Sequence, residues 1–169
     1  MLRTSVLFIS SVVFLSAITG LQGCVTVKIA GESGKKAEGV GYVEPKKPFE
    51  KESRSEVDAA WKNGRNGNLI SFISDCNDPT DPPLNQIVSG VLSGLSDMKS
   101  LEESTPMIQG REGQRVHAAG KVDGVPTEID ILAFKRNHCI YILSYVGVKK
   151  AFAEDRQAFS QFIDGFRAP

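Results

Sequence analysis

The stretch KVDGVPTEIDILAFKRNHCIYILSYV, residues 121–146, decides the fold of this chain. Asp123-Gly124 is a common dipeptide of two-residue hairpin turns, and Asn137-His138 marks a second tight turn. Residues 126–135 lie between these turns and predict a strand. Residues 139–146 are apolar on both faces, which is typical of a strand covered on both sides. Because strands joined by tight turns run antiparallel, the stretch predicts the centre of an antiparallel sheet.

Further strands are predicted on the N-terminal side of this stretch, at residues 59–62, 69–74, 100–107 and 114–122. A helix is predicted after Asp81 and Pro82, because Asp suits the N-cap and Pro suits the first helical position. Its apolar stripe runs from Leu84 to Met98 at spacings of three and four. Gly90 and Gly94 flank the stripe and predict a close approach of this helix to a neighbouring backbone.

A second amphipathic helix, residues 153–166, closes the chain, and its stripe contains Phe159, Phe162 and Phe166. The predicted order is therefore strand, strand, helix, four strands, helix. Two amphipathic helices need an apolar surface to cover their stripes. The sequence thus predicts the α+β class, a sandwich of a single antiparallel β-sheet with two amphipathic helices packed on it.

The N-terminus has the layout of an export signal. Arg3 is followed by the apolar run 6–21, which is short for a membrane-spanning helix. The tetrapeptide Leu21-Gln22-Gly23-Cys24 resembles the lipobox of bacterial lipoproteins. This resemblance implies lipidation of the Cys24 thiol, removal of residues 1–23 and anchoring through acyl chains. The alternative is an ordinary cleaved signal that happens to contain a cysteine.

The residue after Cys24 is Val25 rather than Asp. In the sorting rule of such lipoproteins, Asp at this position retains the protein at the inner membrane. The resemblance therefore implies a lipid anchor that faces the periplasm, with the outer membrane favoured over the inner one.

A charged segment follows the lipidated cysteine. Between Gly31 and Glu56, 12 of 26 residues are charged and few are apolar. Such a composition favours disorder, because little apolar surface is available for burial. The predicted domains are a signal peptide at 1–23, the lipidated Cys24 with a flexible tether at 24–56, and a folded domain at 57–169.

The overall charge is balanced, with 20 Lys and Arg residues against 20 Asp and Glu residues. This balance argues against a nucleic-acid partner and against electrostatic binding to anionic lipid. The expected membrane contact is therefore through the acyl chains on Cys24.

Two cysteines remain after Cys24, namely Cys76 and Cys139. In an oxidising exported compartment, an even pair predicts a disulfide. Two free thiols, or two small buried apolar side chains, are the alternatives. Their spacing is not that of a CxxC redox site.

The remaining polar residues form no catalytic signature. His117 is expected to face solvent from a strand, and His138 lies in a turn; neither has partners at metal-ligand spacing. The acidic residues Asp75, Asp78 and Asp81 suit capping and turns better than a calcium loop. Several charged side chains are expected to be solvated at a sheet edge: Glu102, Glu103, Arg111, Glu112 and Arg115. We predict no catalytic residues, no metal site, no cofactor and no enzymatic activity.

The segments 141–146 and 159–166 resemble the last strand and closing helix of the PsbP-like fold, which is named for an extrinsic subunit of photosystem II. The chain also resembles uncharacterised lipoproteins of Gram-negative bacteria, in segments such as Ser74-Asp75-Cys76 and Cys139-Ile140-Tyr141. Neither resemblance implies an activity, because this fold hosts unrelated roles. The hypothesis favoured here is a non-enzymatic interaction or accessory module with an envelope protein as partner. A small-ligand binder that uses a cleft between sheet and helix is the alternative, and an enzyme with a dispersed site is a third possibility.

Overall fold

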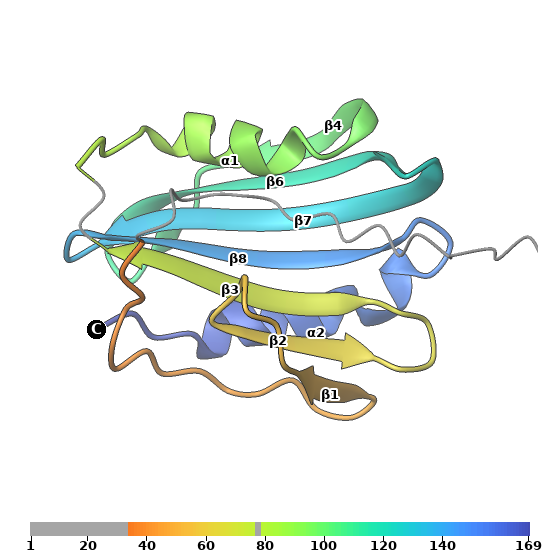
Figure 1. Cartoon of the computed structure of the whole chain (residues 1–169), viewed down its shortest axis with the longest axis horizontal. Coiled ribbons are helices and arrows are strands. Elements are labelled where there is room, and N and C mark those ends of the chain that lie inside the picture. Colours follow the sequence, from red (N-terminus) through yellow and green to blue (C-terminus); the bar gives the residue numbers. More distant parts are fainter. Residues whose placement is uncertain (1–33, 77–78) are drawn as a thin grey trace, which may run out of the picture.

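The structure, a computed structural model, describes residues 34–76 and 79–169. The export signal, Cys24 and Asp78 lie outside the described residues. Eight strands and two helices follow one another along the described chain (Figure 1). Their bounds are β1 Phe49–Glu52, β2 Ala59–Asn63, β3 Leu69–Cys76, α1 Leu84–Leu92, β4 Ser96–Ser104, β5 Met107–Ile108, β6 Arg111–Val122, β7 Val125–Arg136, β8 Cys139–Val148 and α2 Phe152–Gly165.

The strands form one antiparallel sheet in the order β1-β2-β3-β8-β7-β6-β4, and β5 pairs with β6 beside this path. Strand β8 lies at the centre of the sheet, which explains why residues 139–146 are apolar on both faces. Both predicted turns are confirmed. The turn residues Asp123 and Gly124 have φ of 49° and 80°, and Asn137 and His138 have φ of 49° and 61°, as a type I′ hairpin turn requires.

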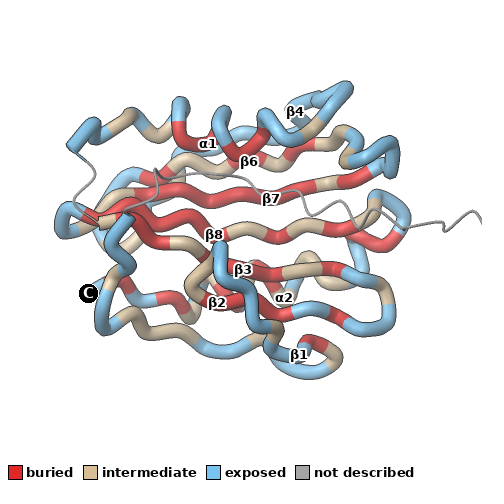
Figure 2. The backbone as a smooth tube through the Cα atoms, viewed as in Figure 1, coloured by how far each residue is buried: buried red, intermediate tan, exposed pale blue. Residues whose placement is uncertain are grey.

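The two helices lie on opposite faces of the sheet and close two different cores. Aromatic side chains dominate the core under α2, whereas aliphatic side chains form the core under α1. Strand β7 contributes to both, because Leu132 and Phe134 belong to the α2 core while Ile129 and Ile131 belong to the α1 core. Figure 2 shows the resulting run of buried residues along β7 and β8. The predicted α+β sandwich is therefore confirmed.

Helix α1 is shorter than its apolar stripe predicted. It ends at Leu92, and Met98 lies in β4, where it is 45% exposed. Asp97 has φ of 51°, a left-handed conformation that a helix interior does not adopt. Leu95 still packs against the aliphatic core under α1. Met98 continued the helical spacing by coincidence, because every residue of β4 is exposed.

The start of α1 also differs from the prediction. Pro83, not Asp81, is the N-cap residue, and no side chain caps the helix. Gly90 has open space around it, so it does not mark a close approach. The close approach is at Gly120 of β6, where an added Cβ would lie 2.9 Å from the Cβ of Leu95.

The predicted boundary between tether and domain is wrong for the described residues. The Lys35 carbonyl accepts a hydrogen bond from the Cys76 amide at 2.8 Å, and residues 49–52 form a strand of the sheet. The Tyr42 ring lies 5.3 Å from both Trp61 and Phe72, between ring centroids. A segment with few apolar residues thus packs firmly when those few meet an existing aromatic core, which composition alone does not reveal.

Candidate functional site

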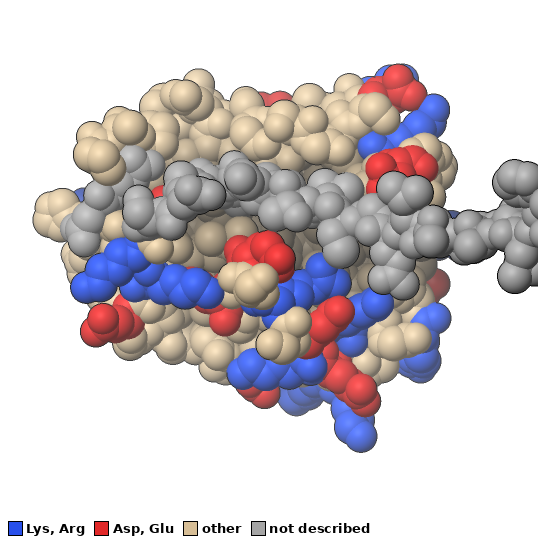
Figure 3. All heavy atoms as spheres, viewed as in Figure 1, with Lys and Arg blue, Asp and Glu red and all other residues tan. Residues whose placement is uncertain are grey.

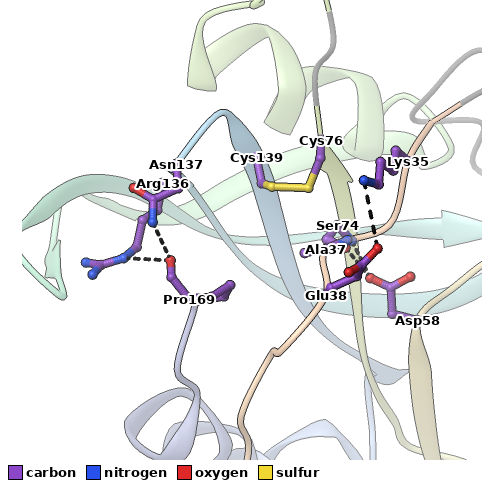
Figure 4. Close-up of a disulfide and its surroundings, with 10 residues drawn as sticks. All are labelled: Lys35, Ala37, Glu38, Asp58, Ser74, Cys76, Arg136, Asn137, Cys139 and Pro169. Carbon is purple, nitrogen blue, oxygen red and sulfur yellow. Dashed lines mark hydrogen bonds and ion pairs between the residues drawn. A yellow bond between two sulfur atoms is a disulfide. The ribbon is translucent and has the colours of Figure 1, made fainter.

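The predicted disulfide joins Cys76 and Cys139, with a distance of 1.99 Å between the sulfur atoms (Figure 4). The two cysteines are paired opposite each other at the end of β3 and the start of β8. We call this part of the sheet, where β3 and β7 end and β8 begins, the disulfide end. The bond covalently fixes the register of two neighbouring central strands.

Both termini of the described chain meet this end. The segment that contains Lys35 pairs with Cys76. A main-chain oxygen of Pro169, the last residue of the sequence, accepts hydrogen bonds from Arg136 Nε at 3.1 Å and Asn137 Nδ2 at 2.7 Å (Figure 4). The chain that leads from the N-terminal region therefore joins the domain beside the disulfide.

A cavity of about 640 Å³ opens at the disulfide end. Its lining contains both hydrophobic and polar groups and is mostly basic in its charged side chains. The lining residues are Asp81, Arg111, Lys135, Arg136, Asn137, His138, Cys139 and Ile140. Asp81 is the acidic residue of this set, and it forms an ion pair with Lys135.

The two arginines of the cavity come from neighbouring strands. Gly113 pairs with Phe134, and Arg111 and Arg136 each lie two residues beyond that pair, toward the disulfide end. Arg136 is held by backbone carbonyls, since its Nη1 donates to the Gln109 oxygen at 2.9 Å. Within residues 34–76 and 79–169, no acidic side chain forms an ion pair with either arginine. The sequence grouped Arg111 with solvated edge charges and gave no sign of a shared cavity.

A second charged cluster lies on the α2 face of β6 and β7. Asp130 is fully buried, and Arg115 donates two hydrogen bonds to its carboxylate, at 2.9 and 2.8 Å. The hydrogen bonds that Arg115 donates to this carboxylate raise the pKa of its guanidinium group. Arg156 of α2 lies 3.7 Å from the same carboxylate and 3.1 Å from Glu102. The prediction that Arg115 is a solvated edge charge is therefore wrong, because it neutralises a buried carboxylate.

His117 does not face solvent as predicted. Its ring stacks on Phe152, with 5.0 Å between centroids and an interplanar angle of 4°. Its Nε2 atom lies 2.9 Å from Oε2 of Glu128. His138, in contrast, is exposed in the turn between β7 and β8. The two histidines therefore have different surroundings: His117 packs against the start of α2, whereas His138 is exposed.

The opposite end of the sheet carries an amide and carboxylate network. Asp155 of α2 accepts hydrogen bonds from the side-chain amides of Asn63, Asn66 and Asn68, each at 2.8 Å. Burial acts to raise the pKa of Asp155, but the asparagine hydrogen bonds outweigh it and lower the pKa. Asn68 is fully buried and also donates to the Ala151 carbonyl. No local sequence pattern linked these asparagines to Asp155, which is 87 residues from Asn68.

Of the three acidic residues that the sequence offered as a calcium loop, the structure describes Asp75 and Asp81. Asp75 is buried on β3, whereas Asp81 lies in the cavity lining with Lys135. In the part of the chain that is described, no group of three metal-binding side chains comes together. Trp61 is 1% exposed and belongs to the aromatic core. No described helix is long and apolar enough to cross a membrane.

Comparison of this protein with known sequences and solved structures identifies its fold. No protein-family model and no curated protein matches the sequence. The structure is similar to LpqN of Mycobacterium tuberculosis, described as involved in cell envelope biogenesis, with TM-score 0.59, 10% identity and coverage of 82% of this chain and 87% of that one. It is also similar to cyanobacterial PsbP from Synechocystis, with TM-score 0.54, 10% identity and coverage of 83% and 97%. The chain therefore has the PsbP-like fold.

Proposed function

We propose that this protein is a periplasm-facing lipoprotein, anchored through Cys24, that serves as a non-enzymatic interaction module of the cell envelope. The observation that carries the proposal is the place where the chain joins the domain. Lys35 pairs with Cys76 only 11 residues after Cys24. Because a fully extended chain spans at most about 3.6 Å per residue, the disulfide end would lie within about 40 Å of the anchor.

The arrangement of polar groups supports binding rather than catalysis. The histidine and the buried carboxylate of the α2 face have partners that serve packing, namely Phe152 for His117 and Arg115 for Asp130. The space between α2 and the sheet is filled by Trp61, Phe162 and other aromatic rings, which leaves little room for a substrate there. The proposed role is also in keeping with the envelope role described for LpqN.

The outer surface offers room for a protein partner. Figure 3 shows charges of both signs over the lower part of one face and few over its upper part. At the sheet edge, β4 is exposed along its whole length and includes Leu101, which is 53% exposed. An exposed edge strand presents backbone N–H and C=O groups with which a strand of a partner can pair.

In-cell crosslinking of the lipidated protein at its native level, followed by mass spectrometry, tests the proposal. Photoreactive residues at Leu101 and, as a control on the opposite edge, at Glu50 would locate the contact. We expect one dominant envelope protein, captured from one edge only, and loss of capture in Cys24→Ala, which should leave the membrane fraction. Unchanged fractionation of Cys24→Ala, or no reproducible partner, would contradict the proposal.

A further inference from the structure

We infer that Asn66 is a site of spontaneous deamidation, and that its hydrogen bond to Asp155 of α2 protects it while the domain is closed. Asn66-Gly67 lies in the turn between β2 and β3, beside the start of α2 (Figure 1). The reaction needs no partner protein and is independent of the proposed envelope role. It converts a contact that holds α2 on the sheet into one that repels it.

An asparagine that precedes glycine is especially prone to this reaction, because glycine has no Cβ to hinder the approach of its backbone nitrogen. The Gly67 nitrogen attacks Cγ of Asn66, loses its proton to solvent and forms a new C–N bond. The Cγ–Nδ2 bond then breaks, and the amide nitrogen leaves as ammonia. One water molecule opens the resulting five-membered imide at either carbonyl, which gives aspartate or isoaspartate at position 66.

The reacting groups are held by hydrogen bonds in the closed domain. The nucleophile, the Gly67 amide, donates to the Asn63 carbonyl oxygen at 2.8 Å. The leaving group, Nδ2 of Asn66, donates to Oδ2 of Asp155 at 2.8 Å. The side-chain oxygen of Asn66 accepts a hydrogen bond from the Asn68 amide at 3.1 Å. Deamidation therefore requires a local opening that frees this turn from α2.

The same dipeptide occurs twice in this turn, and burial distinguishes the two copies. In Asn63-Gly64, the asparagine is only 1% exposed. In Asn66-Gly67, the asparagine is half-buried and the glycine is exposed. Because the reaction consumes water and releases a proton to solvent, we place the site at Asn66.

The product cannot replace Asn66 in the network around Asp155. The amide donates to two carboxylates, those of Asp155 and Glu154, whereas a carboxylate at position 66 has no hydrogen to donate. Like charges then meet at the start of α2, which is unfavourable. Asp155 keeps its hydrogen bonds from Asn63 and Asn68, so the helix stays docked but is held more weakly. Since the step is irreversible, the weakening is permanent.

The reaction is measured on the folded, purified chain at mildly alkaline pH in heavy-oxygen water, by mass spectrometry of the peptide that contains residue 66. We expect a much lower rate in the folded wild type than in the chain held in denaturant. Asp155→Ala should raise the rate at Asn66 by about tenfold, because the amide is no longer held by α2. Ile131→Ala is the matched control, since it lowers stability in the α1 core, away from the network. It should raise the rate far less, and circular dichroism shows whether both variants are folded.

Equal rates in the folded and unfolded wild type, or equal acceleration in Asp155→Ala and Ile131→Ala, would overturn the inference. A second measurement does not depend on the folding of Asp155→Ala. Asn66→Asp mimics the product and should lower the melting temperature by about 4 °C. In the background of Asp155→Asn, where donor and acceptor are exchanged, the same change should cost about half as much or less. An equal cost in both backgrounds would contradict the repulsion on which the inference depends.

Discussion

The two ends of the sheet are held together by different chemistry. At one end a covalent bond joins Cys76 and Cys139, beside a cavity whose charged side chains are mostly basic. At the other end, three asparagine amides converge on Asp155, and their donors are matched by its carboxylate. A disulfide holds two strands together without using polar side chains, so the polar side chains near it remain available for a ligand. A network of hydrogen bonds, in contrast, uses its side chains to hold the structure.

The largest effect is expected at the disulfide end. Replacing both cysteines, Cys76→Ala with Cys139→Ala, removes a cross-link over 63 residues. The chain-entropy model then gives a loss of about 4 kcal/mol in the free energy of unfolding. Denaturant unfolding measures this loss, and reductant should destabilise the wild type but not the double variant. A loss below about 1 kcal/mol would show that the disulfide contributes little to the stability of this end of the sheet.

At the opposite end, Asp155→Ala should lower the free energy of unfolding by about 3 kcal/mol at neutral pH, because it leaves buried amides without their charged acceptor. Glu154→Ala is the control, since Glu154 is exposed and receives only one hydrogen bond, from Asn66. Its expected loss is at most about 1 kcal/mol. Similar losses of stability in both variants would mean that the hydrogen bonds to Asp155 are not the main polar interaction that holds α2 on the sheet.

The same network gives a pH dependence whose sign follows from the lowered pKa of Asp155. Because the folded pKa lies below the unfolded value of about 3.9, the ionised group stabilises the fold at higher pH. This contribution is lost as the pH falls through the folded pKa. The difference between wild type and Asp155→Ala should therefore shrink in acid.

A smaller effect is expected from Gly147→Ala, near the same end. An added Cβ would lie 2.0 Å from Oδ1 of the buried Asn68, so the network must shift to accommodate it. We expect a loss of about 1 to 3 kcal/mol, the usual range for overpacking. Gly64→Ala, where no atom lies within 4 Å of the added Cβ, should change stability by less than about 0.5 kcal/mol. Thermal unfolding of the two variants side by side distinguishes these outcomes.

Local sequence signals predicted the centre of the fold well. The turns at 123–124 and 137–138, the two-sided strand 139–146 and the closing helix all follow from neighbouring residues, and all are present. Helix α1 was predicted too long because Met98 extends a helical spacing inside an exposed strand. A pattern of three and four does not by itself show where the backbone leaves the helix.

The polar clusters were not predictable in this way, because their members come together only through the register of the sheet. Arg115 meets Asp130 because β6 and β7 pair, and Asp155 is 87 residues from Asn68. The overall charge was equally uninformative, since a neutral total does not reveal that the charged side chains lining one cavity are mostly basic. The disulfide was predictable because an even pair of cysteines, in a chain that is expected to be exported, has few alternatives.

The pairing of Gly41 with Arg167 has a consequence for how the protein matures. The first described segment rests on the last one, and β3 pairs with β8 rather than with a strand close to it in sequence. Contacts of such long sequence separation form late in folding. In the proposed export, the N-terminal half of the domain would cross the membrane first and would lack its pairing partners until the final residues had crossed. Factors that protect exposed strands during secretion would act on residues 34–76 for longer than on any later part of the domain.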